Sequence, residues 1–399
     1  MIYNRVRHEG GLQMESFKFI DLFSGIGGFH QAMVNLGGEC VFASEIDKYA
    51  KETYKENYGI EPHGDITKID EKDIPEHDVL CAGFPCQSFS KAGNREGLDD
   101  IRGTLFFDIA RILTEHRTKY IILENVRNLV SHDNGNTWDV MSSTLRRLGY
   151  RLSNAPILIS PHHLGIPQQR ERVVILGVYD PINKDKSLDI SFDKVKKETS
   201  IYDVIDSSSV DDSYYLSEDD KEVLRVWNDF YQGIEEEVIG FPVWLDYLKE
   251  SYDDKMADWK KKIIVRNNEL YKNNKEFIEK WLEENNRLEH FTPTNRKFEW
   301  QAGKDINNIY EGVIQFRPSG VRVKRPNSFP TLVAMVQTPI IGKYERKLTV
   351  REAARLQSFP KEFIPNKDKH QAYKQFGNAV NVKVIETMAR ELFKEGHND

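Results

Sequence analysis

Residues 17–29 read FKFIDLFSGIGGF, an apolar run that leads directly into a glycine-rich turn. The run is typical of a short buried strand, and the pattern from about Gly27 to Leu36 predicts that a helix follows the turn. Glycines let a ligand approach the backbone, and a helix N-terminus presents free N–H groups. The stretch therefore predicts a strand–turn–helix unit of an α/β fold, with a candidate ligand site at the turn.

The alternation of strands and helices continues to about residue 180. Strands are predicted at 40–44, 78–84, 119–123 and 173–178, and helices near 104–114 and 137–148. Strands that alternate with helices favour a parallel sheet with helices on both faces. Because ligands of such sheets bind at the carboxyl ends of the strands, residues that follow strands are the candidates for the site.

Glu45 follows the second predicted strand, 20 residues after Gly25. A carboxylate at this spacing suits hydrogen bonding to the hydroxyls of a ribose. The motif by itself fits a nicotinamide, a flavin or an S-adenosylmethionine cofactor, and it also fits a tight turn without a ligand.

Cys86 lies within GFPCQSFS (83–90), just after another predicted strand. A thiolate at the edge of a sheet can act as a nucleophile, whereas the apolar surroundings of Cys40 and Cys81 suit small buried residues. Glu124 begins ENV (124–126) at the same edge. It can serve there as a general acid, or it can be an ordinary capping or surface acid.

Arg170 and Arg172 lie in QQRER (168–172), just before the last of these strands. Alternate residues of a strand share a face, so the two guanidinium groups suit a phosphate, a base carbonyl or a solvated edge. His162 and His163 have no cysteine or carboxylate nearby to complete a ligand set, so no metal site is expected.

The composition places the chain among globular proteins. Its 399 residues are 39% hydrophobic and 30% charged, which excludes collagen-like and wholly disordered proteins. It has no run of about 18 apolar residues and no apolar leader, so neither a membrane-spanning nor a secreted protein is expected. Three cysteines suit a reducing cytoplasm. Residues 1–15 are expected to form a flexible tail, with Met14 as an alternative start.

Charge is distributed unevenly along the second half of the chain. Residues 211–300 hold 22 acidic and 14 basic residues, although the net charge of the whole chain is only −7. The helical spacing of Val223, Trp227 and Phe230 predicts a small helical subdomain in this segment. Its tryptophans either pack in a core, which we expect, or stack on bases. A basic stretch follows, in which Glu345 is the one acid among Arg317, Arg322, Lys324, Arg325, Lys343, Arg346 and Lys347.

Six segments, in this order, resemble the motifs of the bacterial DNA (cytosine-5) methyltransferase family. They are DLFSGIGGF (21–29), GFPCQSFS (83–90), ENV (124–126), QQRER (168–172), REAARLQSFP (351–360) and YKQFGNAV (373–380). The resemblance covers roughly 14–180 and 345–395. It implies a Rossmann-like S-adenosylmethionine-dependent methyltransferase domain and a smaller target-recognition domain that carries a helical insertion.

The resemblance also implies a reaction and its catalytic residues. The target cytosine is flipped out of the duplex, because its carbon 5 is inaccessible in the base stack. Cys86 then attacks carbon 6, and Glu124 binds or protonates ring nitrogen 3. Arg172, supported by Arg170, holds the carbonyl oxygen of the base. Methyl transfer to carbon 5 converts S-adenosylmethionine to S-adenosylhomocysteine.

The cofactor residues are assigned by the same resemblance. The methionine end of the cofactor is expected at Phe23, Gly25 and Gly27, and the ribose at Glu45. The adenine is expected at Asp65 and Ile66, and Pro85, Asn378 and Ala379 complete the pocket. The family's closest matches have an aromatic residue after the ribose acid, where this chain has Ile46, so adenine stacking at this position is not expected.

In this family the recognition region lies between QQRER and REAARLQSFP. Acidic side chains repel phosphate, so the basic FRPSGVRVKRP (316–326) is a better candidate for DNA contact than the acidic segment. Its arginines either read guanines in the major groove or contact only phosphates. The expected DNA-binding residues are Gln87, Ser88, Arg317, Arg322, Lys324, Arg325, Thr331 and Leu332.

The expected domain organisation is discontinuous. Residues 16–180 form the catalytic domain, 181–345 the recognition domain with 211–300 as its acidic helical insertion, and 346–399 the return to the catalytic domain. Double-stranded DNA is the expected partner of a monomer that is paired functionally with a restriction endonuclease. The alternatives are a tRNA cytosine methyltransferase with the same chemistry and a catalytically inactive DNA-binding protein.

Overall fold

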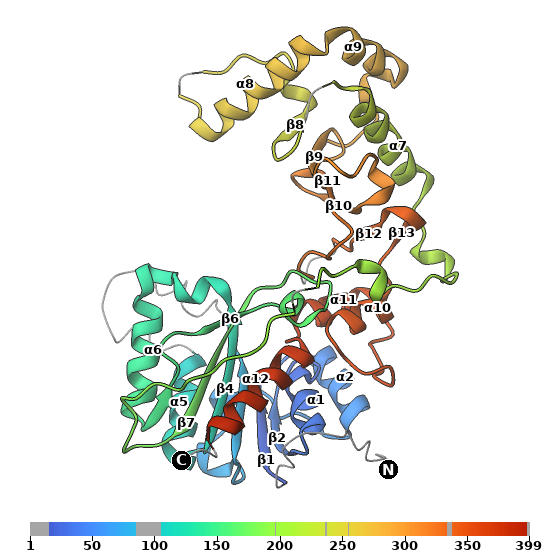
Figure 1. Cartoon of the computed structure of the whole chain (residues 1–399). Helices are drawn as coiled ribbons and strands as arrows, with labels where there is room; N and C mark the ends of the chain where they lie inside the picture. Colours follow the sequence, from blue (N-terminus) through green and yellow to red (C-terminus); the bar gives the residue numbers. More distant parts are fainter. Residues whose placement is uncertain are drawn as a thin grey trace.

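The computed structural model describes residues 16–84, 105–195, 197–235, 238–253, 255–332 and 337–396. These residues form two bodies, each built on its own sheet (Figure 1). The expected tail at 1–15 and the segment 85–104, which contains Pro85, Cys86, Gln87 and Ser88, lie outside the described residues. No helix of the described part is long and apolar enough to cross a membrane.

The first sheet has the strand order β2-β1-β3-β4-β7-β5, and β6 also pairs with β7. Its strands are β1 Lys18–Leu22, β2 Glu39–Ser44, β3 Val79–Gly83, β4 Tyr120–Val126, β5 Tyr150–Leu152, β6 Ile157–Ile159 and β7 Arg172–Tyr179. The pairs among β1 to β4 are parallel, as predicted, whereas β7 is antiparallel to β4. β5 and β6 are in turn antiparallel to β7, so they run in the same direction as β1 to β4. The first sheet is therefore mostly parallel, as expected, and β7 is the described strand that runs against the others.

Helices cover both faces of this sheet. They are α1 Gly28–Asn35, α2 Lys48–Tyr58, α5 Leu105–His116, α6 Asn136–Arg147, α10 Val350–Leu356, α11 Lys369–Asn378 and α12 Val382–Glu395. Ile122 of β4 belongs to the core under α1 and α12, and its neighbours Ile121 and Leu123 belong to the core under α5 and α6. A strand buried on both faces must be apolar throughout, which explains the continuous run at 119–123.

The second body contains a six-stranded sheet with the order β13-β12-β10-β11-β9-β8. Its strands are β8 Pro242–Trp244, β9 Lys297–Gln301, β10 Val313–Arg317, β11 Gly320–Lys324, β12 Ile340–Ile341 and β13 Arg346–Lys347, and its helices are α7 Glu218–Gly233, α8 Asp258–Asn273 and α9 Lys275–Glu284. Ser217 caps α7 by accepting from the N–H of Asp220.

The tryptophans of the acidic segment are mostly structural. Trp227 of α7 is fully buried and stacks on Phe298 of β9, with 5.0 Å between ring centroids. Trp281 of α9 and Trp300 of β9 lie in the same core. The expected packed core is thus confirmed for these three residues, and α7 and α9 pack on the apolar face of the second sheet.

Two features join the bodies. The segment that follows β7 packs on the first body through Leu188, Ile201 and Ile205, which are buried in its core. Arg346 of β13 forms a buried ion pair with Glu352 of α10, with Nη2 and Oε1 2.8 Å apart. The return of the chain to the first body is therefore fixed by a paired charge, whose rupture would leave a buried ion uncompensated.

We expect Trp227→Ala to lower the free energy of unfolding of the second body by about 3–5 kcal/mol, because it empties a fully buried aromatic site. Trp259, whose side chain is 60% exposed on α8, provides the matched control, and Trp259→Ala should change stability by less than about 0.5 kcal/mol. Urea denaturation followed by circular dichroism measures both. Equal losses would contradict the core assignment.

Candidate functional site

A cavity of about 490 Å³ lies at the carboxyl ends of β1 to β4. Six of the predicted cofactor residues line it: Phe23, Gly25, Glu45, Asp65, Ile66 and Asn378. They come from loops that are far apart in the sequence, and the sheet brings them together because the ends of parallel strands share an edge. The strand–turn–helix unit at 18–35 forms as predicted and supplies the floor of this cavity.

Glu45 is held in place by the backbone. Its Oε2 accepts from the N–H of Gly25 at 2.8 Å, and its Oε1 accepts from the N–H groups of Ile46 and Asp47, each at 2.7 Å. Gly25 has φ +55°, and a Cβ added there would meet no heavy atom within 4 Å. The glycine turn therefore leaves open space directly beside a fixed carboxylate, as a nucleotide-like ligand needs.

Two predicted cofactor residues lie beside the cavity rather than on its wall. Gly27 has φ +86°, and a Cβ there would come within 2.2 Å of the Tyr58 ring, whose hydroxyl donates to the carbonyl of Gly27 at 3.0 Å. Ala379 is buried and offers its carbonyl to Arg170. Both residues shape the site through packing and backbone contacts.

The cavity also has wall residues that the sequence interpretation did not single out. Lys374 pairs with Asp47 at 2.8 Å between Nζ and Oδ2, and both line the cavity. Lys374 lies inside YKQFGNAV, so the motif itself was the available signal. Ile46, which stands where the family's closest matches have an aromatic residue, lines the same wall and is 75% exposed.

Glu124 and Arg172 form an ion pair at the end of this cavity. Oε1 of Glu124 lies 3.0 Å from Nε of Arg172, and both side chains are mostly buried. Burial raises the pKa of Glu124, and the charges of Arg172 and Arg170 partly offset that rise. A carboxyl whose pKa is raised in this way holds a proton more readily than an exposed carboxyl does.

The reversed direction of β7 explains how this pair forms. Arg172 begins β7 and lies opposite Val126, near the end of β4. Because β7 is antiparallel to β4, the start of β7 lies at the edge where the parallel strands end. In a parallel arrangement, QQRER would lie at the opposite edge of the sheet, away from Glu124.

Arg170, the predicted support of Arg172, lines the same cavity and is bound to backbone carbonyls. It is 2% exposed, and its guanidinium donates to the carbonyls of Leu332 at 3.1 Å and Ala379 at 3.0 Å. Burial lowers its pKa to about 9. Arg170 thus ties the start of β7 to the second body and to the returning chain, and its donors serve the protein's own carbonyls.

The proposed nucleophile Cys86 lies outside the described residues, but the residues before it are well placed. Gly83 of β3 pairs with Glu124 of β4. The carbonyl of Phe84 accepts from Nδ2 of Asn125 at 3.0 Å. Gly83 and Phe84, the last described residues before this segment, therefore lie beside β4 and line the same cavity as Glu124.

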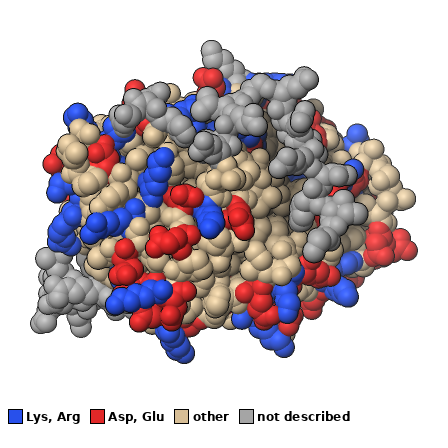
Figure 2. Space-filling model, turned by 90° about the horizontal axis from the view of Figure 1, so that it is seen from below, with Lys and Arg blue, Asp and Glu red and all other residues tan. Residues whose placement is uncertain are grey.

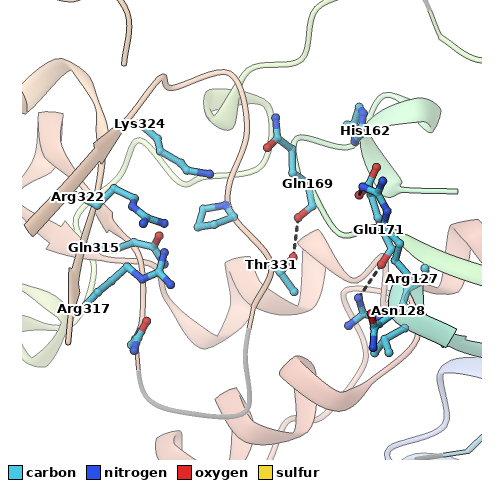
Figure 3. Close-up of a pocket in the computed structure, with 14 residues that line it drawn as sticks. Arg127, Asn128, His162, Gln169, Glu171, Gln315, Arg317, Arg322, Lys324 and Thr331 are labelled. Carbon is cyan, nitrogen blue, oxygen red and sulfur yellow. Dashed lines mark hydrogen bonds and ion pairs between the residues drawn. The ribbon is translucent and has the colours of Figure 1, made fainter. Parts of the chain in front are cut away.

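A second cavity, of about 750 Å³, separates the two bodies. Figure 3 shows Gln315, Arg317, Arg322 and Lys324 reaching into it from one side. The opposite side carries Arg127, Asn128, His162, Gln169 and Glu171. Val126 and Arg172 line both cavities, so the two spaces meet at the Glu124–Arg172 pair.

The remaining predicted DNA-binding residues are placed differently. The hydroxyl of Thr331 donates to the carbonyl of Gln169 at 2.8 Å, at the cavity wall. Leu332 is buried, and its carbonyl binds Arg170. Arg325 is paired with Asp305 and does not line the cavity.

The face of the first body that points away from the second is different in character. Figure 2 shows acidic and basic side chains interspersed there around uncharged surface. In the parts drawn in colour, lysines and arginines do not form the kind of mostly basic lining found between the bodies. A polyanion is thus better matched by the inter-body cavity than by this face.

These features define an α/β enzyme with a small nucleotide-type cavity that meets a wide basic cleft at a buried carboxylate–arginine pair. The chain belongs to the C-5 cytosine-specific DNA methylase family, whose model matches residues 17–394. It is therefore a DNA cytosine-5 methyltransferase.

Relatives support this membership over nearly the whole chain. The type II methyltransferase M1.ScrFI of Lactococcus lactis subsp. cremoris is 37% identical over 95% of this chain and 78% of its own length. The type II methyltransferase M.HhaI of Haemophilus parahaemolyticus is 32% identical over 95% of both chains. In fold, the crystal structure of the S. pombe Dnmt2 methyltransferase is similar, with a TM-score of 0.55 at 18% identity over 95% of this chain and 98% of that chain.

We expect Arg170→Ala to lower the free energy of unfolding by about 3 kcal/mol, because it removes two charge-assisted hydrogen bonds and leaves two carbonyls unpaired. Arg127→Ala, which breaks an exposed ion pair with Glu171, should cost less than about 0.5 kcal/mol. Urea denaturation compares the two, and a similar small cost for both would refute the bridging role of Arg170.

Proposed function

We propose that this enzyme transfers a methyl group from S-adenosylmethionine to carbon 5 of a flipped cytosine within a specific short sequence of duplex DNA. The observation that carries the proposal is the meeting of the two cavities at Glu124 and Arg172. A cofactor in the smaller cavity and a base extruded from DNA in the larger one would meet there.

The smaller cavity suits S-adenosylmethionine. Glu45 is fixed by three backbone N–H groups and would accept from the ribose hydroxyls, and Asp65, which lines the same cavity, would contact the adenine. Phe23 and the open face of Gly25 leave room for the methionine end. When bound, S-adenosylmethionine supplies an electrophilic methyl group.

The protein's own residues would prepare the cytosine. Sγ of Cys86, as a thiolate, forms a bond to carbon 6, and Glu124 delivers a proton to nitrogen 3, which makes carbon 5 electron-rich. Arg172 donates to the carbonyl oxygen of the base and holds Glu124 in position. After carbon 5 is methylated, it loses its proton to water, the Cys86 thiolate departs, and the proton on nitrogen 3 returns to Glu124, which restores the aromatic ring.

A division of labour follows from this scheme. The chemistry is carried out by residues 16–180 and 346–399, and DNA is recognised by residues 181–345. Within the latter range, residues 181–210 pack on the catalytic part, and the acidic helices of 211–300 cover the apolar face of the recognition sheet. The relatives are named type II methyltransferases, which supports pairing with a restriction endonuclease that cuts the same sequence. We further propose that the enzyme acts as a cytoplasmic monomer.

Expression in a methylation-free host, followed by methylome sequencing, tests the function. We expect one short sequence with 5-methylcytosine, and we expect Cys86→Ala to abolish methylation while DNA binding persists. Unchanged methylation by Cys86→Ala would refute the nucleophile. No methylated DNA sequence, from a folded protein that binds S-adenosylmethionine, would instead favour an RNA substrate.

Glu45→Ala should weaken S-adenosylmethionine binding roughly 10- to 100-fold, because a buried ribose hydroxyl would lose a charged acceptor. Glu39, an exposed residue at the start of β2, gives the control Glu39→Ala, which should bind normally. Isothermal titration calorimetry measures both dissociation constants. Equal affinity of Glu45→Ala and the native chain would exclude the proposed ribose contact.

A further inference from the structure

The sheet of the second body has two chemically different faces. Along β9, β10 and β11, alternate residues point to opposite sides. Phe298, Ile314 and Val323 are fully buried on the side of the helices. The other side is polar, and Gln315, Arg317, Arg322 and Lys324 line the cavity between the bodies there.

Arg322 stands out on the polar face because of how it is paired. Gln315 on β10 and Glu299 on β9 are its cross-strand neighbours. Nε and Nη2 of Arg322 both donate to Oε2 of Glu299, at 2.9 and 2.7 Å. Glu299 is held in turn by the side-chain amide of Gln301. The Glu299 carboxylate therefore binds the Nε side of the Arg322 guanidinium and fixes the plane of that group.

This side-on pairing leaves the far end of the guanidinium available. Within the described part of the chain, Nη1 of Arg322 has no hydrogen-bond partner, and the side chain lines the cavity. The end of a guanidinium presents two parallel N–H groups, which match the O6 and N7 acceptors of guanine. Arg325 is different, since Nη1 and Nη2 at its end both donate to Asp305.

The charge around Arg322 also distinguishes a base from a phosphate. Arg322 and Glu299 are only 18% and 15% exposed, so the carboxylate neutralises the cation where water is scarce. A phosphate approaching this pair would be repelled by Glu299, whereas a neutral guanine edge would not be. A rigid, neutralised arginine is suited to reading a base, and an exposed cation at a rim is suited to a phosphate.

We propose that Arg322, positioned by Glu299, reads the O6 and N7 atoms of one guanine in the recognised DNA sequence. This inference rests on the proposed function and identifies the residue that determines its specificity at one base pair. Arg322 contacts the DNA, and Glu299 is a positioning residue.

The test uses the full-length enzyme and duplexes that carry its methylome-defined sequence. Each guanine on both strands is replaced in turn by 7-deazaguanine, which lacks the N7 acceptor. With the native enzyme, we expect kcat/KM to fall roughly 10-fold or more at the guanine that Arg322 reads. Arg322→Ala should be about as slow on the unmodified duplex and should show no further loss with 7-deazaguanine at that position.

Two more variants separate recognition from folding. Glu299→Gln should reduce the preference for guanine over 7-deazaguanine at the same position, with an unchanged dissociation constant for S-adenosylmethionine. Arg390 on α12 is also held side-on, by Glu386, but lies away from the cavity. Arg390→Ala should therefore retain the full native preference.

The outcomes are distinct. If Arg322→Ala keeps the native sensitivity to 7-deazaguanine at every guanine, Arg322 is not the reader and the inference is overturned, while the proposed function stands. If Glu299→Gln keeps the native guanine preference, the positioning role is overturned. A native enzyme that methylates no duplex DNA would overturn the proposed function itself.

Discussion

A carboxylate buried beside arginines is the constraint on which the site depends. Burying the Glu124 carboxylate away from water costs free energy, and the ion pair with Arg172 offsets that cost. The pair can form only because β7 starts where β4 ends. The antiparallel direction of β7 is therefore what brings Arg172 to Glu124. Arg170, two residues earlier, uses the same strand start to bind the loop at Leu332 and the returning chain at Ala379. One short segment thus positions the Glu124 carboxyl and connects both neighbouring parts of the protein.

Much of the first body could be predicted from the sequence, because its strands are long apolar runs followed by glycines or carboxylates. Glu45, Asp65 and Asn378 meet at one cavity for the simple reason that parallel strands end together. The direction of β7 could not be predicted, since the hydrophobic pattern of a buried strand is the same whichever way the strand runs in the sheet. The three-residue strands β5 and β6 are too short for any period to register.

The second body was harder to predict for physical reasons. The helical spacing of Val223, Trp227 and Phe230 identified α7 and its buried face. Whether those aromatics cover a sheet or a nucleic acid depends on contacts with β9, whose pairing is non-local. The charge count moved attention to residues after 316, but it treated Arg322 and Arg325 alike. Their different roles arise from the edge of the guanidinium that each acid occupies, and only coordinates reveal this.

The parallel pairing of β9 with β11 has a consequence for how such enzymes could be recombined. Arg322 lies on the β10–β11 hairpin, but the carboxylate that orients it belongs to a strand 23 residues earlier. A chimaera that receives the hairpin alone would inherit the arginine without its orienting acid. Sequence preference in this protein therefore cannot be transferred with the β10–β11 hairpin alone, and the transferred segment would have to begin upstream of Lys297.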